Sequence, residues 1–344
     1  MTDLFGLTLA ELKDVLAPYH VPAYRAEQIA VWMYQKGVAS FADMTNLPKA
    51  LREALATSLC IKRPRIKDRL ISADGHTEKL LLEYADGVAV ETVLMRQPYG
   101  NSICVSSQAG CNIGCRFCAS TLNGLARDLT RGEMLAQAIT LNDMIRAAGE
   151  GKVDTVVIMG SGEPLKNYDN VLGFIRLMHE PYTLGMSCRS MTLSTSGIVE
   201  GMRRLADEGL PISLSVSLHA PNQALRERIM PIAKHYPLAD VVAAAKHYAD
   251  VTKRRVTYEY ILIDGVTDGE EQARELANLL RGQLASVNLI PINPVAERGL
   301  LRPAPERVER FERYLKSRHI AVTVRREMGA DIQAACGQLR NKHL

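Results

Sequence analysis

The chain has 344 residues and a formal net charge of +4 at pH 7, and 47% of its residues are hydrophobic and 23% charged. This composition is typical of a globular protein and excludes the disordered and fibrous classes, and the length allows roughly two domains. No apolar run approaches the roughly 18 residues of a membrane span, and the N-terminus lacks the basic and apolar regions of a secretory signal. We therefore expect a cytoplasmic protein with no membrane partner.

The first part of the chain predicts three short amphipathic helices. Apolar residues recur at helical spacing in 8–19, 24–37 and 48–59, and Gly or Pro separates these segments. We expect residues 1–62 to form a small helical accessory domain.

A basic segment and a hairpin signal follow the helices. The segment "CIKRPRIKDR" (60–69) carries five basic side chains against one acidic side chain. Two β-rich runs then flank the turn sequence "ADG" within residues 78–95, which is the pattern of a β-hairpin. We expect residues 63–96 to be a β-hairpin linker that leads to a larger domain at 97–344.

In this larger domain, strand candidates alternate with helical segments. The strand candidates span 101–107, 154–164, 190–197, 212–220, 255–265 and 286–294. A helix is expected at 131–149, where Thr130 and Glu133 have the spacing of a capping box. This alternation predicts an α/β fold with a parallel sheet and crossover helices. Because six units are too few for a closed eight-stranded barrel, we expect a partial, open (β/α)6 barrel rather than a doubly wound sheet. Its site should lie at the carboxyl ends of the strands.

Four of the seven cysteines lie in one short stretch, "SICVSSQAGCNIGCRFCAST". Cys111, Cys115 and Cys118 are spaced C-x3-C-x2-C, and Cys104 lies upstream of them. An odd number of crowded cysteines is a poor disulfide framework but a natural arrangement for metal ligation. Zinc sites usually take four ligands from two separated pairs, whereas three thiolates on one loop suit a 4Fe-4S cluster whose fourth iron keeps an open position. The spacing favours a cluster over zinc or a chance grouping.

This loop resembles that of the radical S-adenosylmethionine (radical SAM) enzymes, in which the open iron binds the amino and carboxylate groups of SAM. "GSGEPL", at the end of the second strand candidate, is similar to the Gly-Gly-Glu-Pro region of that superfamily, with Ser161 in place of a glycine. The resemblance implies that Cys111, Cys115 and Cys118 bind the cluster. It also implies that Glu163 meets the SAM ammonium group, a contact that suits a carboxylate.

The resemblance is closer to one branch of that superfamily, the RlmN-type RNA adenine-C2 methyltransferases, over roughly residues 85–344. Motifs of that branch recur here in order: "VSSQAGCNIGCRFCAST", "GSGEPLKNYDNV", "LSTSG", "SVSLHA", "LIPINP" and "GADIQAACGQL". By this resemblance, the residues that bind SAM are Gly162, Glu163, Ser194, Ser217, Leu218, His219 and Asn293. Taken singly, a serine or asparagine at a strand end is a common turn residue, and a lone histidine is commonly a core residue.

The same branch uses two further cysteines, which match Cys104 and Cys336. The resemblance implies that Cys336 takes a methyl group from one SAM, and that a radical made from a second SAM then activates this methyl group. The activated carbon adds to carbon 2 of the adenine, and Cys104 releases the product by forming a Cys104–Cys336 disulfide. Glu91 matches the position of a proton acceptor in this branch. The alternatives are that Glu91 simply faces solvent and that Cys104 is the base.

The resemblance also implies RNA partners and an RNA-binding role for the helical accessory domain at 1–62. These are 23S rRNA at the peptidyl transferase centre and, as in many relatives, the tRNA adenosine beside the anticodon. A flavodoxin-type reductant would supply electrons, and a monomer is expected. The basic segment 60–69 and the tail 301–344, with ten basic against five acidic residues, are candidates for holding RNA phosphates. Charged faces of this size are also common where no nucleic acid binds.

Three alternatives stay open. Cfr-type enzymes, which confer antibiotic resistance, methylate carbon 8 of the same rRNA adenosine and share both cysteines, although the sequences around Cys104 and Cys336 look more like those of the carbon-2 enzymes. A non-catalytic iron-sulfur RNA-binding protein would need neither "GSGEPL" nor those two cysteines. A radical SAM enzyme for a small molecule would need neither the helical module nor the basic tail.

Overall fold

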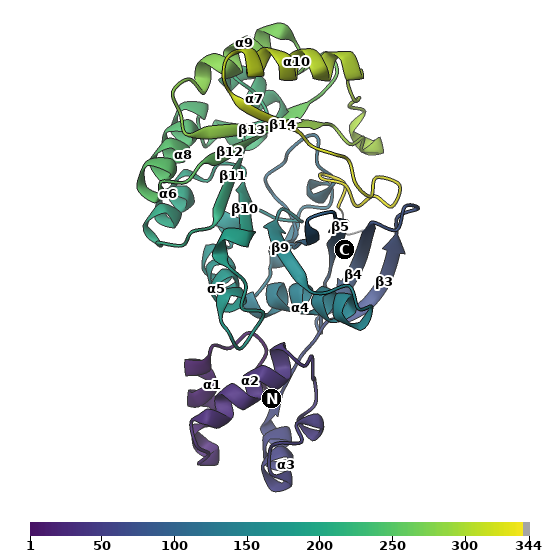
Figure 1. The fold of residues 1–344 in the computed structure, drawn as a ribbon, viewed down its shortest axis with the longest axis vertical. Coiled ribbons are helices and arrows are strands. Elements are labelled where there is room, and N and C mark those ends of the chain that lie inside the picture. Colours follow the sequence, from purple (N-terminus) through teal and green to yellow (C-terminus); the bar gives the residue numbers. More distant parts are fainter. Residues whose placement is uncertain (340–344) are drawn as a thin grey trace.

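The computed structural model describes residues 1–339. The predicted helical module is present and forms the lower end of the molecule in Figure 1. Its elements, with η denoting a 3-10 helix, are β1 (Thr2–Asp3), α1 (Leu9–Leu16), η1 (Ala17–Tyr19), α2 (Tyr24–Tyr34), η2 (Phe41–Asp43), α3 (Lys49–Ser58) and β2 (Leu59–Cys60). Helix α1 begins at a capping box formed by Thr8 and Glu11. The module is held together by a buried apolar core that includes Leu12, Ile29 and Met33.

One ten-stranded sheet forms the centre of the larger part, in the order β14-β13-β12-β11-β10-β9-β6-β5-β4-β3. Its parallel strands are β6 (Gly100–Cys104), β9 (Val153–Ile158), β10 (Met191–Thr195), β11 (Ser213–Ser217), β12 (Val256–Leu262), β13 (Ala285–Pro291) and β14 (Ala321–Val324). The six predicted strands and the open parallel barrel are confirmed. Strand β14 is additional. Its four residues are largely exposed and lie within a charged tail, so its β-branched residues did not stand out as a strand in the sequence.

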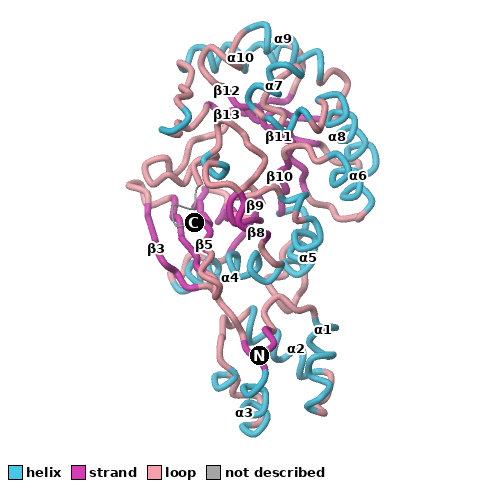
Figure 2. Tube along the Cα trace, turned by 180° about the vertical axis from the view of Figure 1, so that it is seen from behind, coloured by secondary structure: helices cyan, strands magenta, loops and turns pink. Residues whose placement is uncertain are grey.

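Helices join the successive parallel strands and cover the outer side of the curved sheet (Figures 1 and 2). They are α4 (Arg131–Ala147), α5 (Tyr168–His179), α6 (Val199–Asp207), α7 (Gln223–Ile229), α8 (Leu238–Thr252), α9 (Glu270–Leu279) and α10 (Pro305–Ser317). This connectivity places the carboxyl ends of all the parallel strands at one end of the barrel. None of the helices in residues 1–339 has the length and apolar content needed to cross a membrane.

Helix α4 begins at the capping box that the sequence predicted. The Thr130 hydroxyl accepts a hydrogen bond from the Glu133 backbone N–H at 3.2 Å, and the Glu133 carboxylate accepts one from the Thr130 N–H at 2.8 Å. We expect Thr130→Ala to lower the free energy of unfolding by about 1 kcal/mol, because one N–H at the start of the helix loses its partner. Urea titration measures this loss. Thr57→Ala, on the exposed last turn of α3, is the matched control and should stay within about 0.5 kcal/mol of wild type. Equal losses would contradict the contribution of the cap.

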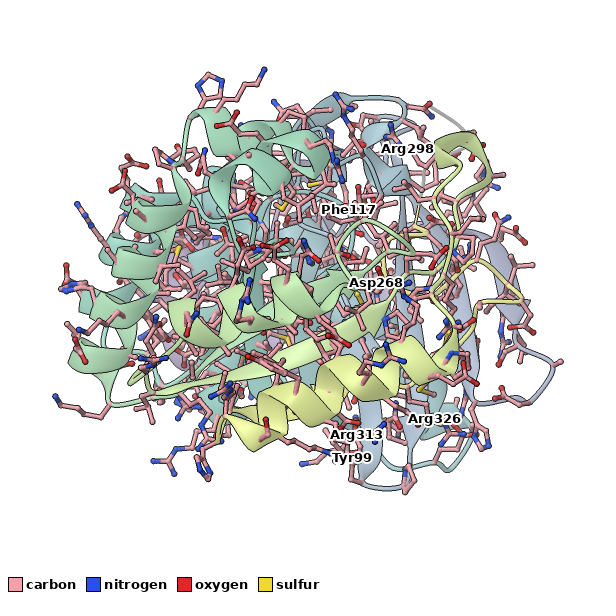
Figure 3. The ribbon with its side chains drawn as sticks, turned by 90° about the horizontal axis from the view of Figure 1, so that it is seen from above. Tyr99, Phe117, Asp268, Arg298, Arg313 and Arg326 are labelled. Atoms are coloured by element: carbon pink, nitrogen blue, oxygen red, sulfur yellow. The ribbon has the colours of Figure 1, made fainter. Side chains whose placement is uncertain are left out.

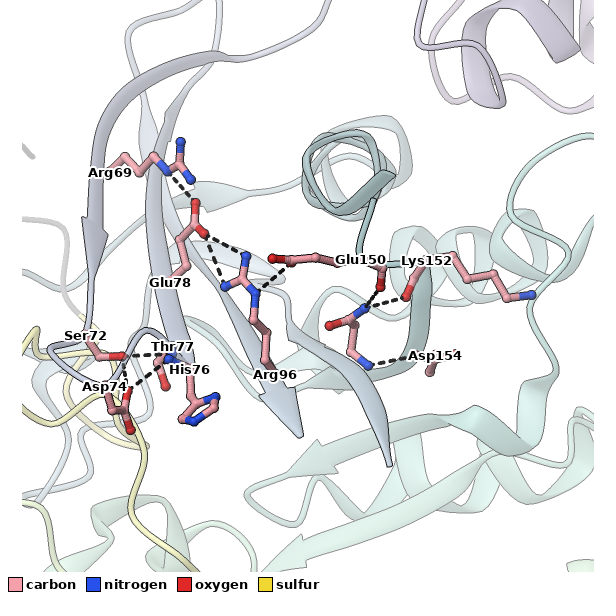
Figure 4. Close-up of polar contacts among 11 residues, drawn as sticks. Arg69, Ser72, Asp74, His76, Thr77, Glu78, Arg96, Glu150, Lys152 and Asp154 are labelled. Atoms are coloured by element: carbon pink, nitrogen blue, oxygen red, sulfur yellow. Dashed lines mark hydrogen bonds and ion pairs between the residues drawn. The ribbon is translucent and has the colours of Figure 1, made fainter. Parts of the chain in front are cut away.

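The predicted hairpin is confirmed as β4 (Thr77–Glu83) and β5 (Ala89–Gln97), and a third strand, β3 (Arg65–Ile71), pairs with β4. Strand β5 pairs antiparallel with β6, so these strands continue the barrel sheet edge to edge. Figure 4 shows how Arg96 on β5 joins them to the barrel: it contacts Glu78 at 3.3 Å and Glu150, beyond α4, at 2.8 Å. These ion pairs fix the antiparallel strands against the parallel ones.

The connections above the barrel carry two further features. Strands β7 (Gln108–Gly110) and β8 (Leu125–Asp128) pair antiparallel and enclose the cysteine loop between them. The remaining 3-10 helices are η3 (Ala119–Thr121), η4 (Pro164–Lys166), η5 (Cys188–Ser190), η6 (Pro231–Lys234) and η7 (Ala296–Arg298). After β14 the chain, yellow in Figure 1, crosses the barrel opening towards β5, where Ala334 and Leu339 pack against Val93.

Candidate active site

A cavity of about 670 Å³ opens where the parallel strands end, as the fold leads us to expect. The strand ends, the cysteine loop and the C-terminal segment all contribute to its wall. The candidate residues on this wall are Cys104, Cys111, Cys115, Cys118, Gly162, Glu163, Ser194, Ser217, His219, Asn293 and Cys336. Residues far apart in the sequence therefore meet around one space. Leu218 and Glu91 lie outside the wall.

Backbone hydrogen bonds fix the cysteine loop on both sides. The Cys111 N–H donates to the Gly124 carbonyl at 2.9 Å, and the Ala119 N–H donates to the Gly337 carbonyl at 2.8 Å. Gly110 has a φ of +80°, and a Cβ there would lie 2.0 Å from the Gly124 oxygen, so a larger residue would push the loop open. The second bond also ties the loop to the segment that carries Cys336.

The donor set of the loop fits an iron-sulfur cluster. Burial raises the pKa of Cys111 to about 12 and also raises the pKa values of Cys115 and Cys118, and charge on neighbouring cysteines adds to each effect. Three thiolates are therefore stable here only beside positive charge, which bound iron provides. No group of three or more His, Cys, Asp or Glu residues within residues 1–339 is placed to hold a single metal ion. In a 4Fe-4S cluster each cysteine binds a different iron, so the three thiols of one loop fit such a cluster.

Glu163 is a buried carboxylate at the carboxyl end of β9, with only 2% of its surface exposed. It accepts hydrogen bonds from the Leu165 N–H at 3.0 Å, the Thr195 hydroxyl at 2.8 Å and the Ser196 N–H at 2.6 Å. Burial raises its pKa, and these bonds oppose that shift. All three donors are neutral, so the carboxylate is arranged to receive a cationic group from the cavity side.

Glycine at position 162 lets the chain pass close to β7. Gly162 has a φ of +105°, and a Cβ there would lie 2.5 Å from Gln108. The Gln108 side-chain oxygen in turn accepts the Glu163 backbone N–H at 2.7 Å. Ser194 and Ser217 stand at the ends of β10 and β11, on the same cavity wall. These positions suit contacts to a ligand that spans the strand ends.

His219 is buried and held as a neutral imidazole. Its Nδ1 accepts the Ile261 backbone N–H at 3.1 Å, and its ring meets the Phe117 ring edge-on at 4.8 Å between centroids. Burial and the nearby charge of Arg226 lower its pKa to about 3. Because Nδ1 accepts, the ring proton lies on Nε2. Leu218 beside it is fully buried, and its contribution to the site is through the backbone.

The structure brings Cys104 and Cys336 to the same cavity, although they come from opposite ends of the larger domain. Asn293 donates to the Cys336 carbonyl at 3.0 Å, and Gln338 donates to the Pro294 carbonyl at 3.2 Å, which fixes the C-terminal segment to the loop after β13. Cys336 is an exposed free thiol. Burial raises the pKa of Cys104 to about 12, and negative charge on the nearby Cys336 adds to the shift.

Glu91 does not face solvent. Its carboxylate forms an ion pair with Lys79 at 2.8 Å, and its side chain is only 11% exposed. Lys79 also donates to the Gln333 carbonyl at 3.1 Å, three residues before Cys336. Glu91 is therefore connected to the segment that carries Cys336, although it lies outside the cavity wall.

The sequence analysis missed a buried polar group deeper in the barrel. Glu259 on β12 is 4% exposed, lines the cavity and accepts a hydrogen bond from Asn288 at 2.8 Å. Burial raises its pKa, and Arg325 opposes this shift. The sequence did contain one indication of this residue, which is an acidic side chain inside an otherwise apolar strand. A charge buried in such a strand needs a partner or a functional role.

Many basic side chains in the two basic regions form ion pairs with carboxylates, so these regions are not simple cationic surfaces. On β3, Arg65 and Lys67 pair with Glu83, and Arg69 pairs with Glu78. Several arginines of the tail are paired as well, and its residues 340–344 lie outside the described part of the chain. The exposed Tyr99 and Arg326 also line the cavity, which places them at its mouth. Figure 3 labels both residues in the same part of the view.

Comparison with protein families and known proteins agrees with this geometry. Residues 105–277 match the radical SAM superfamily, and residues 2–61 match the ribosomal RNA large subunit methyltransferase N-terminal domain. The proteins named probable dual-specificity RNA methyltransferase RlmN from Symbiobacterium thermophilum and Pelotomaculum thermopropionicum are 55% and 51% identical to this chain. Each alignment covers 98% of this chain, with 91% and 90% of the respective relative.

A solved structure is also similar over the whole chain. The radical SAM methyltransferase from Sphaerobacter thermophilus shares 45% sequence identity, with a TM-score of 0.96 and complete coverage of both chains. Membership of the radical SAM superfamily implies a 4Fe-4S cluster and SAM as cofactors, which agrees with the donor set of the cysteine loop. From its sequence, its fold and these relatives, the chain belongs to the RlmN family of radical SAM RNA methyltransferases.

Proposed function

We propose that this enzyme methylates carbon 2 of an adenosine in 23S rRNA and of the adenosine 3′ of the tRNA anticodon, using two SAM molecules per turnover. The observation that carries the proposal is the meeting of Cys104 and Cys336 in the cavity that also contains the cysteine loop. A SAM enzyme that methylates a nucleophilic atom needs neither of these extra thiols. Carbon 2 of adenine has no lone pair to attack a methyl group, so direct polar transfer from SAM cannot methylate it, whereas a radical route with Cys336 as carbon carrier can.

In this proposal, Cys111, Cys115 and Cys118 hold the cluster, which when bound supplies the electron that splits SAM and starts the radical chemistry. Glu163 binds the SAM ammonium group. The three groups that donate hydrogen bonds to its carboxylate are neutral, so its negative charge remains available for that cation. The rest of the SAM molecule is assigned to Gly162, Ser194, Ser217, Leu218, His219 and Asn293. His219 can donate through Nε2 because Nδ1 is occupied by the Ile261 N–H.

Cys336 is the proposed methyl carrier. Its sulfur attacks the methyl carbon of a first SAM, so a sulfur–carbon bond forms on Cys336 and S-adenosylhomocysteine leaves with the electron pair. The deoxyadenosyl group of a second SAM would take a hydrogen atom from this methyl group and leave as 5′-deoxyadenosine. The carbon radical left on Cys336 then adds to carbon 2 of the adenine. The exposed Cys336 thiol suits this order better than Cys104, because burial raises the pKa of Cys104 to about 12 and keeps it protonated.

Cys104 is the proposed resolving residue. One electron of the adduct would return to the cluster, and a base takes the carbon-2 proton. The Cys104 thiol then gives up its proton, and its sulfur attacks the Cys336 sulfur. A disulfide forms, the bond from Cys336 to the carbon breaks, and that carbon takes a proton to become the methyl group. Glu91 is the proposed acceptor of the carbon-2 proton, and Lys79 would hold its carboxylate towards the Cys336 segment. Two electrons must reduce the disulfide before the next turnover.

The remaining partners follow from this chemistry. A flavodoxin-type protein is the proposed electron donor, and the enzyme is proposed to act as a monomer. The target adenosine must leave its stack to reach the cavity, and Tyr99 and Arg326 at the mouth offer an aromatic face and a cation for RNA.

Mass spectrometry of the anaerobically purified protein tests the proposal after incubation with SAM. We expect the peptide that contains Cys336 to carry one added methyl group, and the peptide that contains Cys60 to carry none. Nucleoside analysis of 23S rRNA and tRNA treated with the enzyme should then show 2-methyladenosine in both. An unmodified Cys336 beside an intact cluster would overturn the carrier role. 8-Methyladenosine would identify a Cfr-type enzyme, and product in rRNA alone would remove tRNA from the proposal.

A further inference from the structure

Arg226 is a fully buried arginine that binds the loops proposed to hold SAM. It lies on α7, and none of its surface is exposed. Its guanidinium donates only to backbone carbonyls: those of Ser196 at 2.6 Å, Leu218 at 3.2 Å, Tyr236 at 3.2 Å and Ser217 at 3.4 Å. Within residues 1–339, no carboxylate forms an ion pair with it. Burying a charge without a counterion is unfavourable in free energy, so we expect this arginine to have a role in the site.

The carbonyls that Arg226 binds belong to two loops of the site. Ser196 follows β10, and its N–H is one of the donors to Glu163. Ser217 and Leu218 form the end of β11 and lead directly to His219. A planar guanidinium offers donors in a fixed fork, so a single side chain can hold both loops at one spacing. Lysine has the charge but lacks this fork.

The charge of Arg226 also reaches the cysteine loop. It favours the ionised form of Cys115 and disfavours protonation of His219. Burial lowers the pKa of Arg226 to about 10, so the guanidinium stays charged at neutral pH. Helix α7 is joined to the loop as well, because the Arg116 N–H donates to the Ile229 carbonyl at 2.9 Å. Three thiolates in the loop would provide the negative charge that the buried guanidinium lacks.

We propose that Arg226 is a positioning residue with two separable effects on the radical SAM site. Its fork of donors sets the spacing of the loops after β10 and β11 and thereby the affinity for SAM. Its positive charge, which pairs with no carboxylate of residues 1–339, stabilises the reduced cluster and raises the cluster's reduction potential. Reduction adds one negative charge to the cluster, and a fixed cation in a poorly solvated site lowers the free energy of the more negative state.

This inference rests on the assignment of Cys111, Cys115 and Cys118 to the cluster and of the strand ends to SAM, both part of the proposed function. The experiment distinguishes a failure of this inference from a failure of the proposed function. If the wild-type protein, reconstituted without oxygen, shows no 4Fe-4S signal, the proposed function fails. If wild type shows the signal and binds SAM, only the Arg226 variants decide the inference.

Three variants of the full chain distinguish the effect of the guanidinium's donor geometry from the effect of its charge. They are Arg226→Lys, Arg226→Gln and the control Arg254→Gln. Arg254 also binds the backbone near β11, donating to the Ile212 carbonyl at 2.9 Å, but at the opposite end of that strand. The measurements are the midpoint potential of the cluster by electron paramagnetic resonance, the dissociation constant for SAM and the melting temperature of the cluster-free protein. The midpoint potential and the dissociation constant can both be measured without enzymatic turnover.

We expect Arg226→Gln to lower the ratio of reduced to oxidised cluster at a fixed potential about tenfold, which is 59 mV for a one-electron couple. Arg226→Lys should leave this ratio near the wild-type value. Both variants should weaken SAM binding roughly tenfold, because both lose the fork. Arg254→Gln should change neither quantity, whatever it does to the melting temperature.

Each other outcome overturns the proposal. A wild-type potential in Arg226→Gln would remove the charge effect, and equal shifts in the Lys and Gln variants would attribute it to general distortion. Unchanged SAM affinity in both would remove the positioning effect. If Arg226→Gln takes up no cluster, Arg226→Lys decides alone, since a wild-type potential with weaker SAM binding supports the proposal and a lowered potential contradicts it. Failure of both variants to take up the cluster, with Arg254→Gln loaded, would assign Arg226 to cluster assembly instead.

Discussion

Cys115→Ala is expected to abolish the visible absorbance of the reconstituted 4Fe-4S cluster and to lower RNA methylation by more than about a thousandfold. The loop supplies all the thiols proposed to bind iron, and the pKa of Cys115 is raised by burial and by the charges of Cys118 and Cys111. A thiol in that setting ionises only when metal binds, so its removal leaves one iron without a protein ligand. Absorbance spectroscopy and iron analysis under anaerobic conditions measure the loss.

Two other cysteines of the chain are matched controls for this experiment. Cys188 is buried in η5, and Cys60 lies in β2, and neither lines the cavity. Cys188→Ala and Cys60→Ala should each keep the iron content and absorbance of wild type. The ligand assignment is wrong if Cys115→Ala keeps its absorbance, or if a control loses as much iron as Cys115→Ala does.

Cys104→Ala is expected to trap the RNA on the protein as a covalent adduct and to release no methylated product. Without the second sulfur, nothing breaks the bond between Cys336 and the adenine carbon, although every earlier step can proceed. The adduct should appear as a slowly migrating species on a denaturing gel. Mass spectrometry after nuclease digestion should find a nucleotide on the peptide that contains Cys336.

The partner variant gives the complementary result. Cys336→Ala should form neither adduct nor product while keeping its cluster absorbance, and the double variant Cys104→Ala with Cys336→Ala should behave like Cys336→Ala alone. Normal product release by Cys104→Ala would show that another group resolves the adduct. Methylated RNA made by Cys336→Ala would end the role of this residue as carbon carrier.

The sequence predicted the architecture well because its signals were local. The alternation of strands and helices, the capping box at Thr130 and the hairpin around "ADG" are each encoded in a few neighbouring residues. The additional strands β3 and β14 carry weaker signals. Every residue of β3 is exposed, and β14 has only four residues, most of them exposed, so neither strand stands out from the charged sequence around it.

The interpretation of the charged segments needed the structure. "CIKRPRIKDR" has an excess of basic residues in the sequence, yet Arg65, Lys67 and Arg69 each have an acidic partner on β4. Those partners come from a strand that pairs through the sheet, and sheet pairing is a long-range property. Arg326 and Tyr99 at the cavity mouth gave no comparable signal in the sequence.

The sequence by itself determined the cysteine spacing, the order of the motifs and the type of barrel, because these depend on residues that are close together in the chain. Only the tertiary structure decided that Cys104 and Cys336 share one cavity, that Glu91 is paired with Lys79, and that the buried Arg226 binds the loops after β10 and β11. The physical reason is that burial, charge and hydrogen bonding are set by neighbours in space. Those neighbours come from strands and loops that the chain brings together only when the sheet has formed.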